Sequence, residues 1–197
     1  MHGLWLLPSS WERWTGVFEE AGFAPLTPGR PDDPETVAEA HAHPEAFAGK
    51  SVGQVADHSA GLIGKLDRRP VVVGHSFGGL ITQMMAGRGL AAATVAIDPA
   101  PFRGVLPLPV SSLRAARPAL GNPANFHRAV PLTYEQFRYS FANAVEEEEE
   151  EEEEARELYE TYAVPAPGEP LFQAAAANIN PWTEVKVDTL HAGRARF

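Results

Sequence analysis

A serine lies between two glycines at the junction of two apolar segments. Residues 71–73 are three consecutive valines, and such a β-branched run is typical of a short buried strand. Residues 80–86 have the composition and period of a helix. Residues 74–78, with the sequence GHSFG, are therefore predicted to form a strand-to-helix turn. A turn of this kind suits nucleophilic chemistry, in which the hydroxyl oxygen of Ser76 attacks an acyl carbon.

The spacing of the glycines has a physical reason. A serine on so sharp a turn has a strained backbone, and a Cβ atom at Gly74 or Gly78 would collide with neighbouring backbone. The side chain of Ser76 would then stand above the edge of the sheet. The amide of Phe77, at the positive end of the following helix, would lie beside it and could stabilise an oxyanion. The alternative interpretation is a glycine-rich turn that contains a serine by chance.

These residues resemble the α/β-hydrolase superfamily, in the group whose nucleophile elbow reads Gly-His-Ser-Phe-Gly-Gly. A second motif supports the resemblance, because residues 2–5, with the sequence HGLW, are similar to the oxyanion loop of that family. The resemblance implies an α/β fold, with a mostly parallel sheet and a helical cap insertion. It also implies that Ser76 is the nucleophile and that the backbone amides of Leu4 and Phe77 form the oxyanion hole.

The activity implied by the resemblance is esterase-like hydrolysis of a small ester or a related acyl substrate. No cofactor and no metal is expected. Lyases and cofactor-free haloperoxidases of the same superfamily share this elbow, so they stay open as alternatives.

The general base is the difficulty in this interpretation. In this family the acid and the histidine follow the serine along the chain, each after a later strand. Only His127 and His191 follow Ser76, and neither comes after a predicted strand in the family manner. His75 is a signature residue of the elbow rather than a base, and we favour a turn-opening role for Asp98 over that of a triad acid. The chain is therefore expected to be inactive or weak, and a non-catalytic remnant or ligand-binding fragment is the alternative.

Composition excludes several other classes of function. The 197 residues include no cysteine, which excludes disulfides, thiolate catalysis and Cys-ligated zinc. The net charge is −10, but residues 146–154 are nine consecutive glutamates, and without them it would be −1. No nucleic-acid partner and no membrane contact are expected, and a cytoplasmic protein with a small-molecule substrate is the default. His41 and His43 do not share a helix face, so a metal site there is not expected.

The order of elements predicts three regions: a partial α/β-hydrolase core at 1–101, a helical cap containing the poly-Glu run at 102–182, and a truncated or aberrant tail at 183–197. The predicted strands are residues 23–26, 71–73 and 94–97, with an approach to another at 185–187. The predicted helices begin at capping boxes at Ser9, Ser51 and Thr133, and another follows the elbow. The tryptophans after Ser9 are predicted to be core residues. The poly-Glu run is expected to be a solvated helix extension or a disordered bulge.

Both ends of the chain look incomplete against the family pattern. No apolar strand precedes residue 2, and no strand with an acid and a histidine follows residue 190. We therefore expect exposed sheet edges, through which copies of the chain could self-associate.

Overall fold

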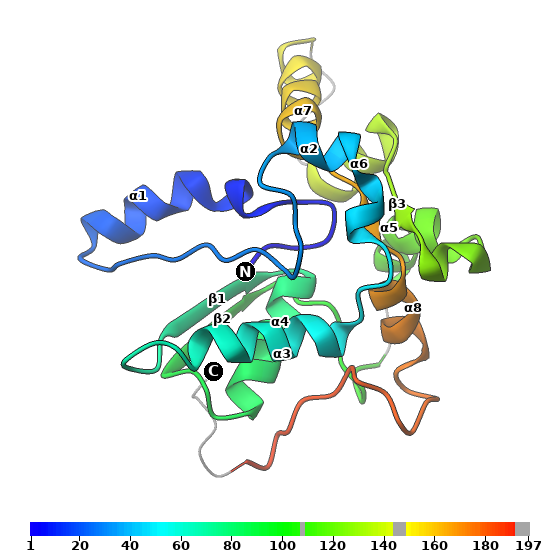
Figure 1. Ribbon diagram of the computed structural model, residues 1–197. Helices are drawn as coiled ribbons and strands as arrows, with labels where there is room; N and C mark the ends of the chain where they lie inside the picture. Colours follow the sequence, from blue (N-terminus) through cyan, green and yellow to red (C-terminus); the bar gives the residue numbers. More distant parts are fainter. Residues whose placement is uncertain (107–108, 144–148, 192–197) are drawn as a thin grey trace.

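A computed structural model describes residues 1–106, 109–143 and 149–191 (Figure 1). Its helices are α1 (Glu12–Glu20), α2 (Val37–Ala42), α3 (Val52–Ile63), α4 (Phe77–Gly87), α5 (Val110–Leu120), α6 (Tyr134–Phe141), α7 (Glu149–Tyr162) and α8 (Glu169–Ala176). Short 3-10 turns are η1 (Pro8–Trp11), η2 (Pro44–Phe47) and η3 (Pro123–His127). The strands are β1 (Val71–His75), β2 (Ala93–Ile97), β3 (Ala129–Val130) and β4 (Ala166–Pro167).

Strands β1 and β2 are parallel and α4 connects them. Their register pairs Val71 with Ala93 and His75 with Ile97. The strand and helix alternate as predicted, because the β-branched run is followed by an apolar helical segment. Val72 is buried in one cluster with Ala86 of α4, so the face that carries it belongs to the core.

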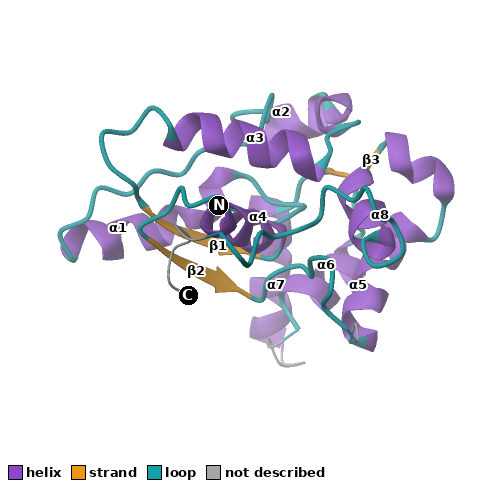
Figure 2. Cartoon of the chain, turned by 90° about the horizontal axis from the view of Figure 1, so that it is seen from below, coloured by secondary structure: helices purple, strands orange, loops and turns teal. Residues whose placement is uncertain are grey.

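Helices α5 to α8 gather beyond the carboxyl ends of β1 and β2, whereas α3 packs beside α4 (Figures 1 and 2). Strands β3 and β4 form a short antiparallel pair among them. One hydrophobic cluster joins this part to α4 and the N-terminal loop, and its buried members include Leu4, Leu80, Phe137, Leu171 and Val185. The region boundaries expected after residues 101 and 182 stay a prediction.

Several local predictions are confirmed. Ser51 and Gln54 form a capping box at the start of α3, and Thr133 and Gln136 form another at the start of α6. Both strands on either side of α4 are present as well. These signals are local, because a cap satisfies amides only three residues away.

The prediction of a capping box at Ser9 is wrong. Residues 8–11 form a 3-10 turn that starts at a proline, and the Oγ atom of Ser10 donates to the carbonyl oxygen of Leu7 at 2.8 Å. Helix α1 begins at Glu12, and no side chain caps it.

One strand prediction is also wrong, because residues 23–26 are not a strand. Residues 185–187, predicted to approach another strand, have no regular structure either. A strand needs a neighbour that completes its hydrogen bonds, and in the described ranges β1 and β2 pair only with each other. Val185 is nevertheless fully buried, so its apolar character serves packing instead.

The two tryptophans that follow Ser9 have different surroundings. Trp11 is buried as predicted, but Trp14 is 50% exposed, which corrects the prediction that it is a core residue. Helix α1 stands apart from the sheet and contacts mainly η1 (Figure 1). Helical spacing therefore produced an apolar face that little of the described chain covers.

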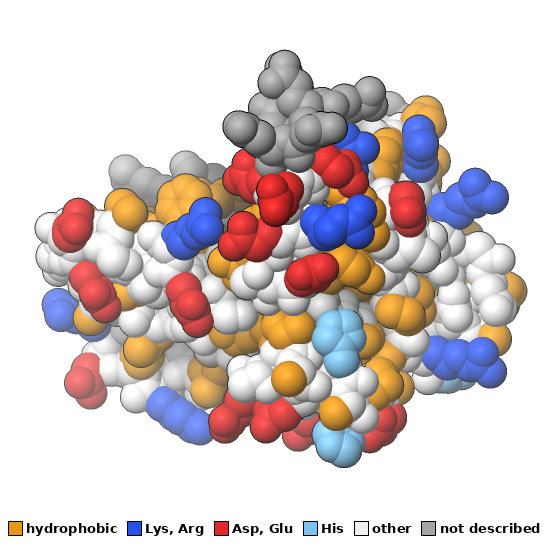
Figure 3. Space-filling model, turned by 90° about the horizontal axis from the view of Figure 1, so that it is seen from above, with side chains coloured by type: hydrophobic (Ala, Val, Ile, Leu, Met, Phe, Trp, Pro, Cys, Tyr) orange, Lys and Arg blue, Asp and Glu red, His pale blue; other side chains and the backbone are white. Residues whose placement is uncertain are grey.

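Helix α7 contains residues 149–154 of the poly-Glu run, which supports the helix extension for that part, and residues 146–148 lie outside the described ranges. Acidic side chains gather on one part of the surface in the view from above (Figure 3). Two arginines offset the negative charge of Glu152 in α7. Its Oε2 atom lies 3.5 Å from Arg138 Nε, and its Oε1 atom lies 3.4 Å from Arg156 Nη2. No helix in the described ranges combines the length and apolar character needed to cross a bilayer.

Candidate active site

Ser76 lies between the end of β1 and the start of α4, where its backbone has φ 55° and ψ −121°. A non-glycine residue rarely adopts this conformation, so the surroundings must hold it. The amide of Ser76 donates to the carbonyl oxygen of Ile97 at 3.0 Å, and its own carbonyl accepts from the amides of Leu80 and Ala100. The predicted turn is therefore present, and hydrogen bonds from three segments hold its strained residue.

The two glycines of the turn make close backbone contacts, as predicted. A Cβ atom on Gly74 would overlap the carbonyl oxygen of Gly78. A Cβ atom on Gly78 would overlap the carbonyl oxygen of Met1 and lie 2.5 Å from that of His2. The glycine at 78 is therefore what lets the N-terminal loop approach the first turn of α4.

The N-terminal loop, residues 2–5, packs directly on the serine. A Cβ atom on Gly3 would lie 3.1 Å from the Cβ atom of Ser76. The next residue, Leu4, is buried, and Trp5 has a φ of 62°. The indole nitrogen of Trp5 donates to the carbonyl oxygen of Val130 at 2.8 Å, which anchors the far end of the loop. The structure thus brings this loop and the start of α4 to Ser76, while the oxyanion role of the Leu4 and Phe77 amides stays a prediction.

The described part of the chain places no histidine in a hydrogen bond with the serine. All seven histidines of the sequence lie in the described ranges, and there no side chain hydrogen-bonds to the Oγ atom of Ser76. His127 lies in η3, with its ring edge-on to Phe126 at 4.7 Å between centroids. His191 lies outside the helices and strands, near the end of the described chain.

His75 and Asp98 end the two neighbouring strands. Burial lowers the pKa of His75, and the negative charge of Asp98 opposes this only in part. Asp98 has a φ of 40° directly after β2, which fits a residue that opens a turn. Neither observation tests a catalytic role for either residue.

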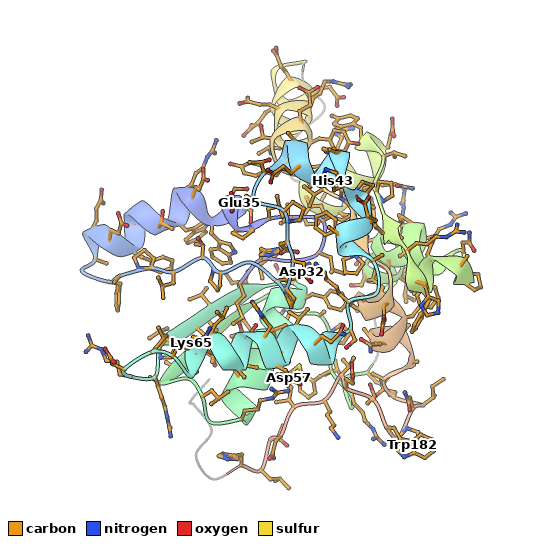
Figure 4. All side chains as sticks on the ribbon, viewed as in Figure 1. Asp32, Glu35, His43, Asp57, Lys65 and Trp182 are labelled. Atoms are coloured by element: carbon orange, nitrogen blue, oxygen red, sulfur yellow. The ribbon has the colours of Figure 1, made fainter. Side chains whose placement is uncertain are left out.

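A buried charged cluster lies behind the N-terminal loop, and it was not predicted from the sequence. The Nε2 atom of His2 lies 3.3 Å from Asp33 Oδ2, and Lys50 Nζ lies 3.8 Å from Asp33 Oδ1. Arg30 donates from its guanidinium to the carbonyl oxygen of His2 at 3.2 Å. Asp32, next to the cluster, is labelled in Figure 4. The only sequence signal was a Pro- and Asp-rich loop, which predicts an irregular segment rather than a buried ion pair.

These contacts shift the pKa values of the cluster. Burial, followed by the positive charge of Arg30, lowers the pKa of His2, and the contacts with Asp33 and Gly3 oppose the change. Burial opposes ionisation of Asp33, but its contact with His2 and the charge of Arg30 outweigh this and lower its pKa. Burial also lowers the pKa of Lys50.

A pocket of about 180 Å³ opens beside the serine turn, between the sheet and α1. It is lined by His2, Gly3, Leu6, Ser10, Trp11, Trp14, His75 and Ile97. Aromatic residues of α6 and α7 pack against one another: the ring centroids of Phe137 and Phe141 are 5.0 Å apart, and those of Phe137 and Tyr159 are 5.4 Å apart.

Residues 1–196 match the model of the alpha/beta hydrolase family. The chain belongs to this family. The predicted family and α/β fold class are therefore confirmed, with a small parallel sheet and helices around it. A comparison with curated proteins found no match.

Two solved structures are similar to the hydrolase chain. One is an extracellular alpha/beta-hydrolase from a Paenibacillus species, described as sharing structural and functional homology with tobacco salicylic acid binding protein 2; the identity is 22%, the TM-score is 0.60, and the match covers 87% of this chain and 66% of that one. The other is a monoacylglycerol lipase of Paleococcus ferrophilus, with 18% identity, a TM-score of 0.48, and coverage of 88% and 63%.

The chain therefore spans just under two thirds of the length of either structure. At these identities the likeness concerns the fold alone. The cytoplasmic location stays a prediction, and the Paenibacillus protein is described as extracellular.

Proposed function

We propose that the chain is an esterase-like serine hydrolase for a small ester, with Ser76 as its nucleophile. The observation that carries the proposal is the strained backbone of Ser76, at φ 55°, between β1 and α4 and against the loop that begins at His2. Strain at one residue is retained where the surroundings enforce it, and such residues cluster at active sites. The amides of Leu4 and Phe77 would bind the oxyanion.

In the proposed reaction, the Oγ atom of Ser76 bonds to the acyl carbon, and the carbonyl electrons move to an oxygen that the two amides stabilise. The carbonyl then re-forms, the bond to the alcohol oxygen breaks, and the serine proton passes through water to the departing alkoxide. A second water hydrolyses the acyl-serine and releases the carboxylic acid. The reaction uses no cofactor.

Turnover should be slow. A serine hydroxyl is a weak nucleophile until a positioned base takes its proton, and in the described ranges no histidine hydrogen-bonds to Ser76 Oγ. Oxyanion stabilisation and binding alone give about 10³–10⁴-fold acceleration over water. We therefore expect measurable but weak ester hydrolysis.

The size and the apolar lining of the pocket favour a small substrate. Its apolar lining includes Trp11, Trp14 and Ile97, and it has room for about one ring or a short acyl chain. The Paenibacillus hydrolase is described as a structural and functional homologue of a salicylic acid binding protein, so small aromatic esters are suitable first substrates.

A second candidate is a ligand-binding protein without turnover. In the described ranges no histidine forms a hydrogen bond with Ser76 Oγ, and this favours a binding protein. The lyase and cofactor-free haloperoxidase alternatives share the same elbow, and no feature of the site favours them.

An alkyl fluorophosphonate distinguishes the two candidates. The hydrolase should become labelled on Ser76, as read by mass spectrometry of the peptide that contains it, and Ser76→Ala should abolish both labelling and hydrolysis of a nitrophenyl ester. Ser111→Ala, which changes an exposed serine, is the matched control and should leave both unchanged. Labelling equal in the native chain and Ser76→Ala would contradict the proposal. Quenching of tryptophan fluorescence by salicylate without labelling would support the binding protein.

A further inference from the structure

Charged groups are buried directly behind the N-terminal loop. The exposed fractions of the side chains are 2% for His2, 3% for Asp33 and 8% for Lys50. Burying such groups costs free energy, and apolar residues of similar volume are often at least as stabilising. Stability alone therefore does not account for this cluster.

The ring of His2 has a defined orientation. Its Nδ1 atom lies 3.0 Å from the carbonyl oxygen of Gly3. A carbonyl oxygen can only accept, so Nδ1 carries the proton of this hydrogen bond. The other ring nitrogen, Nε2, lies 3.3 Å from Asp33 Oδ2 and could donate to it only if the ring carried a second proton. Asp33 is held instead by the backbone amide of Arg30, which donates to its Oδ2 atom at 2.9 Å.

The carbonyl that His2 binds belongs to the same peptide unit as the amide of Leu4. A peptide unit is planar and trans, so the direction of the Gly3 carbonyl sets the direction of the Leu4 N–H. The other side of the loop is fixed as well, because the carbonyl oxygen of His2 lies against Gly78 and accepts from Arg30.

We infer that His2 is a positioning residue, which orients the Leu4 amide toward an oxyanion formed at Ser76. Arg30 and Lys50 hold Asp33 and the backbone of His2 in place. The inference rests on the proposed function, because it assigns the Leu4 amide to the oxyanion.

Two substitutions at one position test the ring contact. In His2→Asn the side-chain amide nitrogen occupies the place of Nδ1 and can still donate to the Gly3 carbonyl, whereas His2→Gln places its amide nitrogen near Nε2. Loss of one oxyanion donor costs about 10²–10³-fold, so fluorophosphonate labelling should slow at least tenfold in His2→Gln. It should stay within a few-fold of the native rate in His2→Asn. Arg88→Gln, which removes an exposed ion pair with Asp57, is the control and should not change the rate (Figure 4).

A second measurement does not depend on activity. Residual dipolar couplings of the folded full chain report the direction of the Leu4 N–H bond, and the coupling should change in His2→Gln but be kept in His2→Asn. Equal couplings in all three chains would overturn the inference, as would equal labelling rates in the two variants. No labelling in the native chain would contradict the proposed function instead, and the couplings would then decide the positioning role alone.

Discussion

The carbonyl oxygen of His2 lies against Gly78, 2.5 Å from the point that a Cβ atom would occupy there. This contact joins two segments that are far apart in the sequence, the N-terminal loop and the first turn of α4. It holds the proposed oxyanion loop against the helix that follows the proposed nucleophile. Any side chain at position 78 would push the two apart.

Gly78→Ala should therefore destabilise the fold and displace the loop. We expect the free energy of unfolding, measured by urea titration, to fall by about 2 kcal/mol, as for other overpacked sites. Gly61→Ala in α3 is the matched control, since a Cβ atom there meets nothing within 4 Å. It should raise the free energy of unfolding by about 0.5–1 kcal/mol through helix propensity. Similar effects of the two substitutions would show that the approach at Gly78 is not tight.

Acid should destabilise the chain in two steps. Burial and the charge of Arg30 lower the pKa of His2 from its ordinary 6.5, so below about that pH the unfolded chain binds a proton that the folded chain does not. The free energy of unfolding then falls as the pH falls. The pKa of Asp33 is lowered from 3.8, and the stability that its ionised form contributes is lost as the pH falls further, through its folded pKa.

His2→Asn should remove the first of these steps and weaken the second, because Asp33 loses its contact with the ring but keeps the charge of Arg30 nearby. The measurement is a series of urea titrations between about pH 8 and pH 3, which brackets the ordinary pKa values of both groups. The exposed His41 provides the control, because His41→Asn should leave the profile of the native chain unchanged. A first step that persists in His2→Asn would contradict the assignment to His2.

We propose that copies of the chain self-associate through the open side of the small sheet. Val71 and Val95 are 52% and 49% exposed, and no strand in the described ranges other than β1 and β2 belongs to this sheet. Exposed apolar strands with free edges are templates for association. Sedimentation velocity should show concentration-dependent association, and Val71→Lys should weaken it at least tenfold. Ile179→Lys, at an exposed site in the helical region, should not weaken the association. Equal association of both variants would exclude the sheet as the interface.

Much of the local structure was predictable because its causes lie within a few residues. A run of valines favours a strand, glycines two residues on either side of a serine permit the turn, and caps such as Ser51 with Gln54 bind amides of their own first turn. The same local signals failed where a partner was needed. Residues 23–26 have strand composition but no neighbouring strand in the described ranges, and the helical spacing of Trp14 does not bring a surface to cover it.

The sequence by itself determined the family, the elbow at Ser76 and the loop expected to face it, because each is a short motif with a fixed spacing. Only the tertiary structure decided what holds that loop, since Asp33 reaches His2 across a segment with no regular period. It also decided that no histidine hydrogen-bonds to Ser76 in the described ranges. Burial and ion pairing between residues far apart in the sequence depend on how the elements pack. The spacing of residues along the chain does not reveal how far apart they lie in the folded structure.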